Sequence, residues 1–404
     1  MAKPAVLYIS YDGMLEPLGQ SQVLAYLEKL APDYAIHILS FEKKADWANG
    51  ARRSAVSGRI HAAGIGWTAL RYHKSPTAPA TAFDITIGTI VALRIALRRR
   101  VAIVHARSYV PALIALTLKK LLGCRFLFDM RGLWADERVD GGLWPADGRL
   151  YRTAKWLERH LLVAADHIVT LTDASATEIR QFPYLANRAP RISVIPTCAD
   201  LDRFSVQGPP AQSPFVLGYV GSVGTWYLFD EMLRCFLVVA GEEPGARLLI
   251  VNRNEHPAIR DRLQAIGIDP AAVQIIAADH ADVAALIGRM SAAMAIITPS
   301  YSKIASAPTK LAEYLGCGVP CLGNDAVGDM AAILEGHRVG VSLPGFSDQE
   351  LREGVRRLLE LTREPDLQTR CRNTAVELFS LDLGVTAYHG IYGELVRASD
   401  RVAA

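Results

Sequence analysis

Two lysines, Lys303 and Lys310, stand seven residues apart in the stretch PSYSKIASAPTKLAEYLG, and the chain has no other lysine after residue 200. The strand-like run AAMAIIT precedes them, and a helix is predicted to begin near Pro308 and to end before Gly318. The backbone N–H groups at a helix start attract anions, and each lysine adds a compact positive charge. Together they predict a site for a diphosphate.

Glu313 follows Lys310 by three residues, so both side chains lie on one face of the predicted helix. A carboxylate in this position could accept hydrogen bonds from the two hydroxyls of a ribose. The alternative is an ordinary surface pair of Lys310 and Glu313, which contributes little to stability.

Two common nucleotide-binding motifs are absent from the sequence. The glycines of GYVGSVG do not have GxGxxG spacing, and no acidic residue ends the next predicted strand. No GxxxxGK[ST] phosphate loop occurs. The sequence therefore argues against NAD or FAD binding and against P-loop kinase or nucleoside-triphosphatase chemistry.

Short apolar runs alternate with amphipathic helical stretches through both halves of the chain. The runs of the first half are AVLYIS, AIHILSF, VAIVHARS, RFLFDMRG, HIVTLTD and RISVIPT, and those of the second are FVLGYVGS, ARLLIVN, AVQIIAA, AAMAIIT, VPCLGN and VGVSL. Buried parallel strands covered by helices on both faces have this pattern. The predicted fold class is α/β, with two Rossmann-like, doubly wound domains.

The length of 404 residues is also more than one core usually supports. A cluster of Gly208, Pro209 and Pro210 interrupts the alternation and predicts a linker. The predicted domains are 1–203 with 383–404, and 204–382. The last helix is expected to return to the first domain through one apolar stripe, made of Tyr388, Ile391, Tyr392 and Leu395.

The amino-terminal run AVLYIS is short and has no cleavage site, so a strand and a cytosolic protein are expected rather than a signal peptide. The most apolar long stretch, Ile85 to Leu97, contains Arg94 and is expected to be too short to cross a bilayer of about 30 Å. The six cysteines form no CxxC pair and are expected to be reduced and buried.

Charge is unevenly distributed along the chain. The first 200 residues hold 26 lysines and arginines against 17 aspartates and glutamates, whereas the remainder holds 18 against 24. Basic clusters at 98–100, 119–120 and 149–159 predict that the first domain faces a membrane surface or an anionic acceptor; solvated helix ends are the alternative. Nucleic acid is not expected, because no aromatic residues interleave with the basic ones.

Charged residues also gather in FDMRGLWADE. Asp129 and Arg131 end a predicted strand, and Asp136 and Glu137 follow in the same loop. Because binding residues favour such loops, Asp129, Arg131 and Asp136 are predicted to bind the acceptor; an internal ion pair is the alternative. The triplet DLD at 200–202 resembles a metal-binding DxD motif but lies in the predicted linker, so no metal is expected.

Four segments, PTKLAEYLGCGVP, VIPTCADLDRF, GYVGSVGTWY and GQSQ, resemble the family-4 glycosyltransferases of the GT-B fold, and the likeness covers nearly the whole chain in the right order. The resemblance implies two Rossmann-like domains facing across a cleft, with a nucleotide-sugar donor on the second and the acceptor on the first. It also implies transfer with retention of anomeric configuration, and no required metal or other cofactor.

Carried over to this chain, the resemblance assigns Glu313 to the ribose hydroxyls and Lys310 to the pyrophosphate. It assigns Gly316 and Gly318 to close helix packing. In the first domain it assigns Gly19, Gln20 and Ser21 to a loop near the donor phosphate and acceptor. It matches His105, at the end of VAIVHARS, to a histidine near the transferred sugar; a structural strand-end histidine is the alternative.

Two positions depart from the family pattern. Ala305 stands where the family commonly has a glutamate that contacts the donor sugar, so Lys303 or Ser306 is expected to replace it. The loop GSVGTWYLF lacks the arginine and lysine that commonly clamp the diphosphate, so Lys303, Lys310 and the backbone of 221–224 are expected to take over. The predicted catalytic residues are His105 and Lys310, and the predicted donor-binding residues are Gly19, Gln20, Gly221, Ser222, Lys303, Ser306, Thr309, Lys310 and Glu313.

These observations predict a retaining, metal-independent hexosyltransferase in surface polysaccharide assembly. Its donor is a nucleotide-diphosphate sugar, its acceptor a glycan or a lipid-linked glycan, and its location the cytoplasm or the inner face of the membrane. Two alternatives stay open. A sugar-nucleotide epimerase would turn over the donor without an acceptor, and a non-catalytic nucleotide-sugar binding protein, which Ala305 favours, would give no product.

Overall fold

The computed structural model describes residues 3–206, 208, 214–278 and 282–403, with side chains to residue 398. The chain forms two compact units, unit 1 from Met1–Ile195 with Leu381–Ala404 and unit 2 from Pro196–Ser380. The divisions follow residues 195 and 380, which are eight and two residues before the predicted boundaries at 203 and 382. Pro209 and Pro210 of the predicted linker lie outside the described residues.

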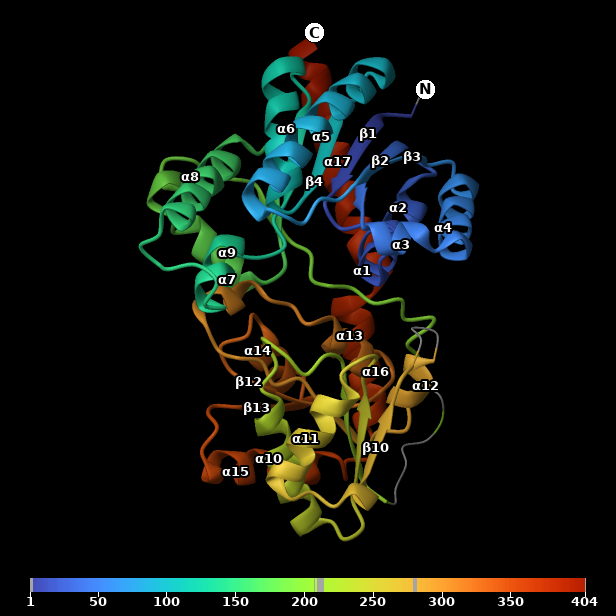
Figure 1. Cartoon of the computed structure of the whole chain (residues 1–404), viewed down its shortest axis with the longest axis vertical. Helices are drawn as coiled ribbons and strands as arrows, with labels where there is room; N and C mark the ends of the chain where they lie inside the picture. The colour runs from blue at the N-terminus through green and yellow to red at the C-terminus, as the bar shows by residue number, and fades with distance from the viewer. Residues whose placement is uncertain (1–2, 207, 209–213, 279–281, 404) are drawn as a thin grey trace. The chain divides into compact units, whose positions relative to one another are not determined.

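Unit 1 contains a seven-stranded sheet in the order β3-β2-β1-β4-β5-β6-β7, and every pairing in it is parallel. Figure 1 labels its strands β1 to β4. The parallel sheet confirms the predicted doubly wound arrangement. One strand, β3, was not predicted, because it is a half-exposed edge strand without an apolar run. The strands are β1 (Ala5–Ser10), β2 (Ala35–Glu42), β3 (Gly66–Arg71), β4 (Ile103–Arg107), β5 (Arg125–Asp129), β6 (His167–Thr170) and β7 (Ile192–Val194).

The helices of unit 1 pack against this sheet and against each other, with α5 on α6 and α17 on α2, β4 and β5. The predicted stripe of α17 is buried, which confirms that the last helix returns to the first domain. The helices are α1 (Pro17–Gly19), a π-helical turn at Gln20–Leu24, α2 (Ala25–Leu30), α3 (Lys44–Ala48), α4 (Gly50–Ala62), α5 (Thr77–Arg99), α6 (Tyr109–Leu122), α7 (Trp134–Asp140), α8 (Arg149–Ala164), α9 (Asp173–Arg180), a 3-10 turn at Pro183–Leu185, and α17 (Leu381–Ala403).

Helix α5 corrects one expectation. The apolar stretch at 85–97 was expected to be too short to cross a bilayer, but α5 has 23 residues and a mean hydropathy of 1.6 over its most apolar window. By length and composition alone this helix could span a membrane. It packs on α6 and β1 within unit 1, although only 28% of that window is buried.

Unit 2 contains a six-stranded sheet in the order β10-β9-β8-β11-β12-β13, again with parallel pairings throughout. Its strands are β8 (Val216–Val220), β9 (Arg247–Val251), β10 (Val273–Ile276), β11 (Ala292–Met294), β12 (Cys321–Asn324) and β13 (Gly340–Leu343). Its helices are α10 (Phe229–Glu242), α11 (His256–Ile266), a 3-10 turn at Pro270–Ala272, α12 (Val283–Ile287), a 3-10 turn at Tyr301–Ala305, α13 (Thr309–Gly316), α14 (Met330–Gly336), α15 (Asp348–Leu361) and α16 (Leu367–Phe379).

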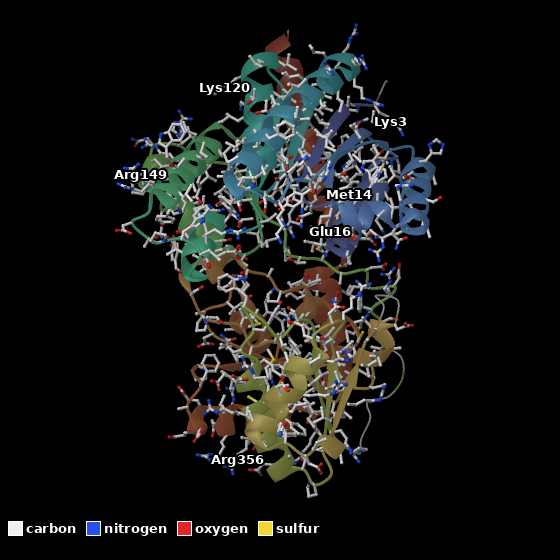
Figure 2. All side chains as sticks on the ribbon, in the orientation of Figure 1. Lys3, Met14, Glu16, Lys120, Arg149 and Arg356 are labelled. Atoms are coloured by element: carbon white, nitrogen blue, oxygen red, sulfur yellow. The ribbon has the colours of Figure 1, made fainter. Side chains whose placement is uncertain are left out.

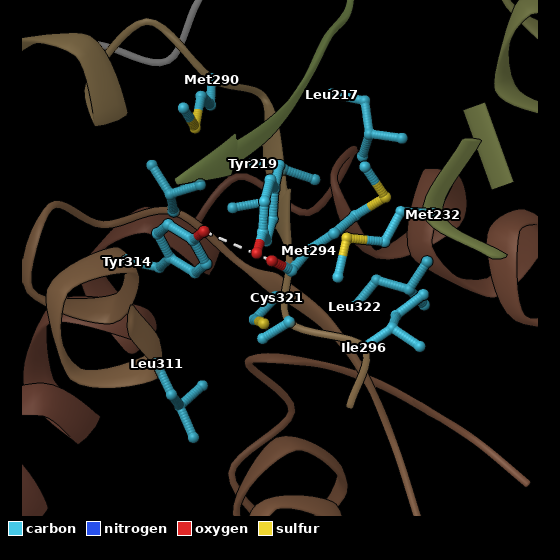
Figure 3. Packing of buried hydrophobic residues seen from close by; sticks show 14 of the residues in the cluster. Leu217, Tyr219, Met232, Met290, Met294, Ile296, Leu311, Tyr314, Cys321 and Leu322 are labelled. Carbon is cyan, nitrogen blue, oxygen red and sulfur yellow. Dashed lines mark hydrogen bonds between the residues drawn. The ribbon is translucent and has the colours of Figure 1, made fainter. Parts of the chain in front are cut away.

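The core of unit 2 lies between this sheet and its helices, where Tyr219, Met294 and Tyr314 pack with aliphatic side chains (Figure 3). Cysteines contribute to both cores as small apolar side chains. All six are buried and none is in a disulfide, as predicted.

Candidate functional site

The lysine-bearing segment of unit 2 follows β11 and leads into α13. Lys303 lies in the 3-10 turn at Tyr301–Ala305, and Lys310 is the second residue of α13, after Pro308 at the N-cap position. Gly318, past the helix end, has a φ of 78°, a conformation that favours glycine. The helix and its two predicted boundary residues are therefore confirmed.

Close packing fixes α13 on the sheet. The buried Tyr314 hydroxyl donates to the Met294 carbonyl (3.3 Å) and accepts from the Val220 N–H (3.0 Å) (Figure 3). A Cβ on Gly316 would lie 2.8 Å from Leu201 Cδ2 and 2.9 Å from the Phe204 carbonyl oxygen. The helix start, with Lys310 and Glu313, is thus held on a rigid support.

Lys310 is buried between Tyr219 of β8 and Tyr227 of the loop that follows β8. Its Nζ lies 3.5 Å from the centroid of the Tyr227 ring and 5.0 Å from that of Tyr219, and 3.5 Å from the Tyr219 hydroxyl oxygen. A Cβ on Gly221 would lie 2.5 Å from this Nζ, so the loop passes directly over the ammonium group. Burial lowers the pKa of Lys310 to about 7, although the Glu313 carboxylate opposes the shift.

Lys303 makes a similar contact with the neighbouring aromatic residue. Its Nζ lies 3.7 Å from the centroid of the Trp226 ring, and its side chain is buried. Both lysines of the segment therefore meet consecutive aromatic residues of the loop after β8.

That loop offers fewer free backbone donors than the sequence suggested. The Gly221 N–H donates to the Val251 carbonyl (2.9 Å), and the Val223 N–H donates to the Glu255 carboxylate (3.1 Å). Asn252 fixes the loop further, because its Nδ2 donates to the Gly221 carbonyl (2.8 Å). Ser222 is exposed, and its carbonyl accepts a hydrogen bond from the Tyr219 hydroxyl.

Glu313 is half-buried one turn after Lys310. Burial raises its pKa to about 7, against the opposing charges of Lys310 and Arg203. Thr309 and Ser306 are half-buried near the helix start, whereas Ala305, where the family commonly has glutamate, is buried. The structure thus brings Lys303, Lys310 and Glu313 together on one short segment.

The candidate site of unit 1 is built on the carboxyl ends of β4 and β5. The buried Asp129 carboxylate lies 3.6 Å from Arg107 Nη1, 3.8 Å from Arg131 Nη1 and 3.7 Å from His105 Nε2. Burial acts to raise the pKa of Asp129, but Arg131, His105 and Arg107 outweigh it and hold that pKa below its usual value. The predicted pair of Asp129 and Arg131 therefore lies together.

His105 lies in the middle of β4 rather than at its end. Its ring is buried between Tyr8 and Tyr388, with centroids 4.4 and 5.1 Å away, and its Nδ1 is 2.8 Å from the Tyr392 hydroxyl. Burial lowers its pKa, which favours a neutral imidazole. The role of His105 beside the transferred sugar stays a prediction; Arg107 is the residue that ends the strand.

Asp136 has different partners from the cluster around Asp129. Its carboxylate accepts from the Tyr151 hydroxyl (2.9 Å) and pairs with Lys155 (2.9 Å). This ion pair joins Asp136 to helix α8, outside the segment FDMRGLWADE, and acceptor binding by Asp136 stays a prediction. The ion pair also removes Lys155 from the predicted basic run, since the same ammonium group pairs with the buried Glu158 (2.5 Å).

The loop after β1 is shaped by a buried carboxylate. Glu42 accepts from the N–H groups of Met14 (2.8 Å) and Leu15 (3.2 Å). A Cβ on Gly19 would lie 2.0 Å from the Gly13 carbonyl oxygen, so the close turn requires glycine. Gln20 follows, and its Nε2 lies 3.5 Å from the Leu15 carbonyl oxygen.

Within the described part of the chain, no group of three or more histidine, cysteine, aspartate or glutamate side chains is arranged to hold a metal ion. The carboxylate of Asp200 accepts from the N–H groups of Asp202 (3.2 Å) and Arg203 (3.3 Å), which makes DLD a turn.

Sequence reasoning missed three residues of these two regions, Trp226, Tyr227 and Arg107. A signal was present for each. Arg107 ends an apolar strand, and the two aromatics follow β8 in a loop at the carboxyl edge of the second sheet, where parallel sheets carry their ligands.

Comparison with known proteins gives the family. Residues 22–198 match the glycosyl transferase 4-like domain and residues 202–377 match the glycosyl transferases group 1 domain. No curated protein matches the chain in sequence.

Three solved structures illustrate the shared fold. Sucrose-phosphate synthase from Thermosynechococcus elongatus is 13% identical with a TM-score of 0.71, covering 98% of this chain and 100% of that one. Anabaena HepE, solved with UDP-glucose, is 12% identical with a TM-score of 0.66 (96% and 99% covered). The lipopolysaccharide outer core galactosyltransferase WaaB is 14% identical with a TM-score of 0.65 (96% and 99% covered). The two matched domains and the two Rossmann-like units establish that this chain belongs to the family-4 glycosyltransferases of the GT-B fold.

Proposed function

We propose that this glycosyltransferase transfers a hexose, with retention of anomeric configuration and without a metal, from a nucleotide-diphosphate sugar to a glycan or lipid-linked acceptor in surface polysaccharide assembly. The observation that carries the donor assignment is the meeting of Lys303, Lys310 and Glu313 on one segment of unit 2. The UDP-glucose complex of HepE and the lipopolysaccharide substrate of WaaB support a nucleotide-sugar donor and a glycan acceptor.

In this mechanism the bond between the sugar and the diphosphate loosens first, and negative charge grows on the leaving phosphate. An ammonium group in a dry site stabilises such charge strongly. Lys310 has this environment, because it is buried beneath Gly221. A phosphate oxygen then accepts the proton of the acceptor hydroxyl, which attacks the same face of the sugar.

Helix α8 supports a location at the inner face of a membrane. Its outer stripe exposes Arg149, Arg152, Trp156 and Arg159, and Trp156 is 58% exposed; Arg149 extends outward in Figure 2. Basic residues beside an exposed tryptophan suit the interface of an anionic membrane.

The donor is tested by a thermal-shift panel of UDP-, GDP-, ADP- and dTDP-sugars. A true donor at a hundred times its dissociation constant adds about 2.7 kcal/mol of stability. If no nucleotide sugar stabilises the protein, the donor assignment is wrong. Incubation of the stabilising donor with lipid-linked glycans separates transfer from the alternatives, since an epimerase converts the donor alone and a binding protein yields no product.

Lys310→Met keeps the length of the side chain but removes its charge. We expect a loss of about a hundredfold in kcat, because one preorganised electrostatic contact is worth about 3 kcal/mol in the transition state. Lys74→Met, on an exposed lysine of unit 1, is the matched control and should retain full activity. Equal rates for both variants would contradict the leaving-group role.

Glu313→Gln tests the ribose contact. A neutral amide accepts a weaker hydrogen bond than a carboxylate, so donor affinity should fall about tenfold with little change in melting temperature. The measurement is donor titration by calorimetry, and an unchanged dissociation constant would contradict the ribose contact of Glu313.

A further inference from the structure

The aromatic loop after β8 stands where relatives are expected to carry the diphosphate clamp, and it meets both lysines of the donor segment. Trp226 and Tyr227 are consecutive, and their rings lie 3.7 Å from Lys303 Nζ and 3.5 Å from Lys310 Nζ respectively. Two separate ammonium groups on two adjacent rings are not explained by core packing alone, because Trp226 and Tyr227 are only partly buried.

The backbone holds these two rings in place. The Thr298 N–H donates to the Trp226 carbonyl (2.9 Å), and Leu228 donates to the Ile296 carbonyl (3.1 Å). The loop is thereby tied to residues 296–298, which follow β11 and lead into the lysine segment. Thr225, just before the rings, has a φ of 55°, an uncommon conformation for a β-branched residue and one that costs energy.

A ring face under an ammonium group stabilises the charge and also fixes its position. Lysine is a flexible side chain with much rotamer freedom to lose. A ring that holds the side chain before the ligand arrives reduces the entropy lost on binding.

We propose that Trp226 and Tyr227 are positioning residues of the donor site, which hold the ammonium groups of Lys303 and Lys310 ready for the diphosphate in place of a clamp supplied by the loop itself. The proposal rests on the proposed function, since it takes the ligand to be a diphosphate. It assigns a specific task to GSVGTWYLF, the segment that departs from the family pattern.

The first test needs no ligand. In protein labelled with 13C at the lysine ε-carbon, the ε-protons of Lys303 and Lys310 should resonate upfield of the other lysines because of the Trp226 and Tyr227 ring currents. Lys310→Arg assigns the Lys310 signal. Tyr227→Phe should keep the upfield shift of Lys310, whereas Tyr227→Leu should reduce it to the smaller shift that the Tyr219 ring, 5.0 Å away, produces. A Lys310 signal at the ordinary lysine position in the unaltered protein overturns the proposal.

The second test measures binding of inorganic pyrophosphate, which reports on the lysines whatever base the donor carries. Tyr227→Leu should weaken binding about tenfold, within the range of a desolvated cation–π contact, while Tyr227→Phe restores it to within twofold. Trp226→Leu and Trp226→Phe are a second, independent pair of variants, which tests the contact of Trp226 with Lys303 in the same way. Pyrophosphate affinity that is unchanged in both leucine variants overturns the proposal.

The outcomes separate this proposal from the proposed function. If nucleotide sugars bind and transfer proceeds but both leucine variants keep pyrophosphate affinity, only the positioning role fails. If the leucine variants lose pyrophosphate affinity but the protein binds no nucleotide sugar, the positioning role stands and the proposed donor is wrong.

Discussion

Lys310 shows how strongly one residue depends on its surroundings. An exposed lysine has a pKa of about 10.4, but burial beneath the loop after β8 lowers the pKa of Lys310 to about 7. A bound diphosphate would favour the charged form. At pH values above 7, the protein should therefore take up a proton as the diphosphate binds.

This linkage predicts how affinity depends on pH. Above the free-protein pKa, UDP affinity should fall by up to tenfold per pH unit, because protonation of Lys310 must accompany binding. Calorimetry at pH 8 in HEPES and in Tris, whose ionisation enthalpies differ, measures the proton uptake. Burial raises the pKa of Glu313 to about 7, so this residue would release a proton when its carboxylate binds a ribose. Glu313→Gln removes this proton release and Lys310→Met removes the proton uptake, so the two variants separate the two effects. Lack of uptake in Glu313→Gln would contradict the prediction.

For Asp129 we expect an effect on the stability of the fold rather than on catalysis. Its pKa is held below the usual value, so the carboxylate stabilises the fold at neutral pH, and this stabilisation is lost as the pH falls through the folded pKa. Asp129→Asn removes one of the two negative partners of the buried Arg107, the other being Asp12 at 3.3 Å, and should cost up to about 3 kcal/mol. Urea unfolding at pH 7 measures the loss, and Asp202→Asn, on an exposed carboxylate, is the control. Equal unfolding midpoints for both variants would contradict this account.

The residues of the two sites differ in how well the sequence predicts them. The spacing of Lys310 and Glu313 places them on one helix face whatever the rest of the chain does, and the structure has them there. The burial of His105 depends on Tyr388 and Tyr392, which come from a helix almost three hundred residues further along the chain. No local pattern carries that information.

At the scale of elements, buried strands can be predicted from the sequence, whereas edge strands cannot. The central strands are apolar runs because both of their faces are covered. The edge strand β3 is half-exposed and has a mixed sequence, so it escaped prediction. Helix α5 begins before its apolar run, at Thr77, and its length could not be inferred from hydropathy alone.

Helix α8 predicts binding to anionic vesicles. Arg152→Glu on its exposed stripe should weaken binding to phosphatidylglycerol vesicles, by about 1 to 2 kcal/mol because an attraction becomes a repulsion. Arg260→Glu makes the same charge change on an exposed residue of α11 in unit 2 and should leave binding unchanged. Vesicle sedimentation at physiological salt measures both, and equal binding would show that α8 does not face the membrane.

At the scale of the whole molecule, two repetitions of the same strand and helix alternation predicted two Rossmann-like units, and the two parallel sheets confirm them. The uneven charge follows the same division, because the basic clusters lie in unit 1 and the two isolated lysines in unit 2. A basic unit suits an anionic acceptor or membrane, while a unit poor in lysine makes Lys303 and Lys310 stand out.

The most direct measurement is a crystal structure of the protein with UDP. The donor assignment predicts that the β-phosphate lies within hydrogen-bonding distance of Lys310 Nζ and that the ribose hydroxyls bind Glu313. Phosphates bound to another loop, with Lys310 still enclosed by Tyr219 and Tyr227, would contradict it.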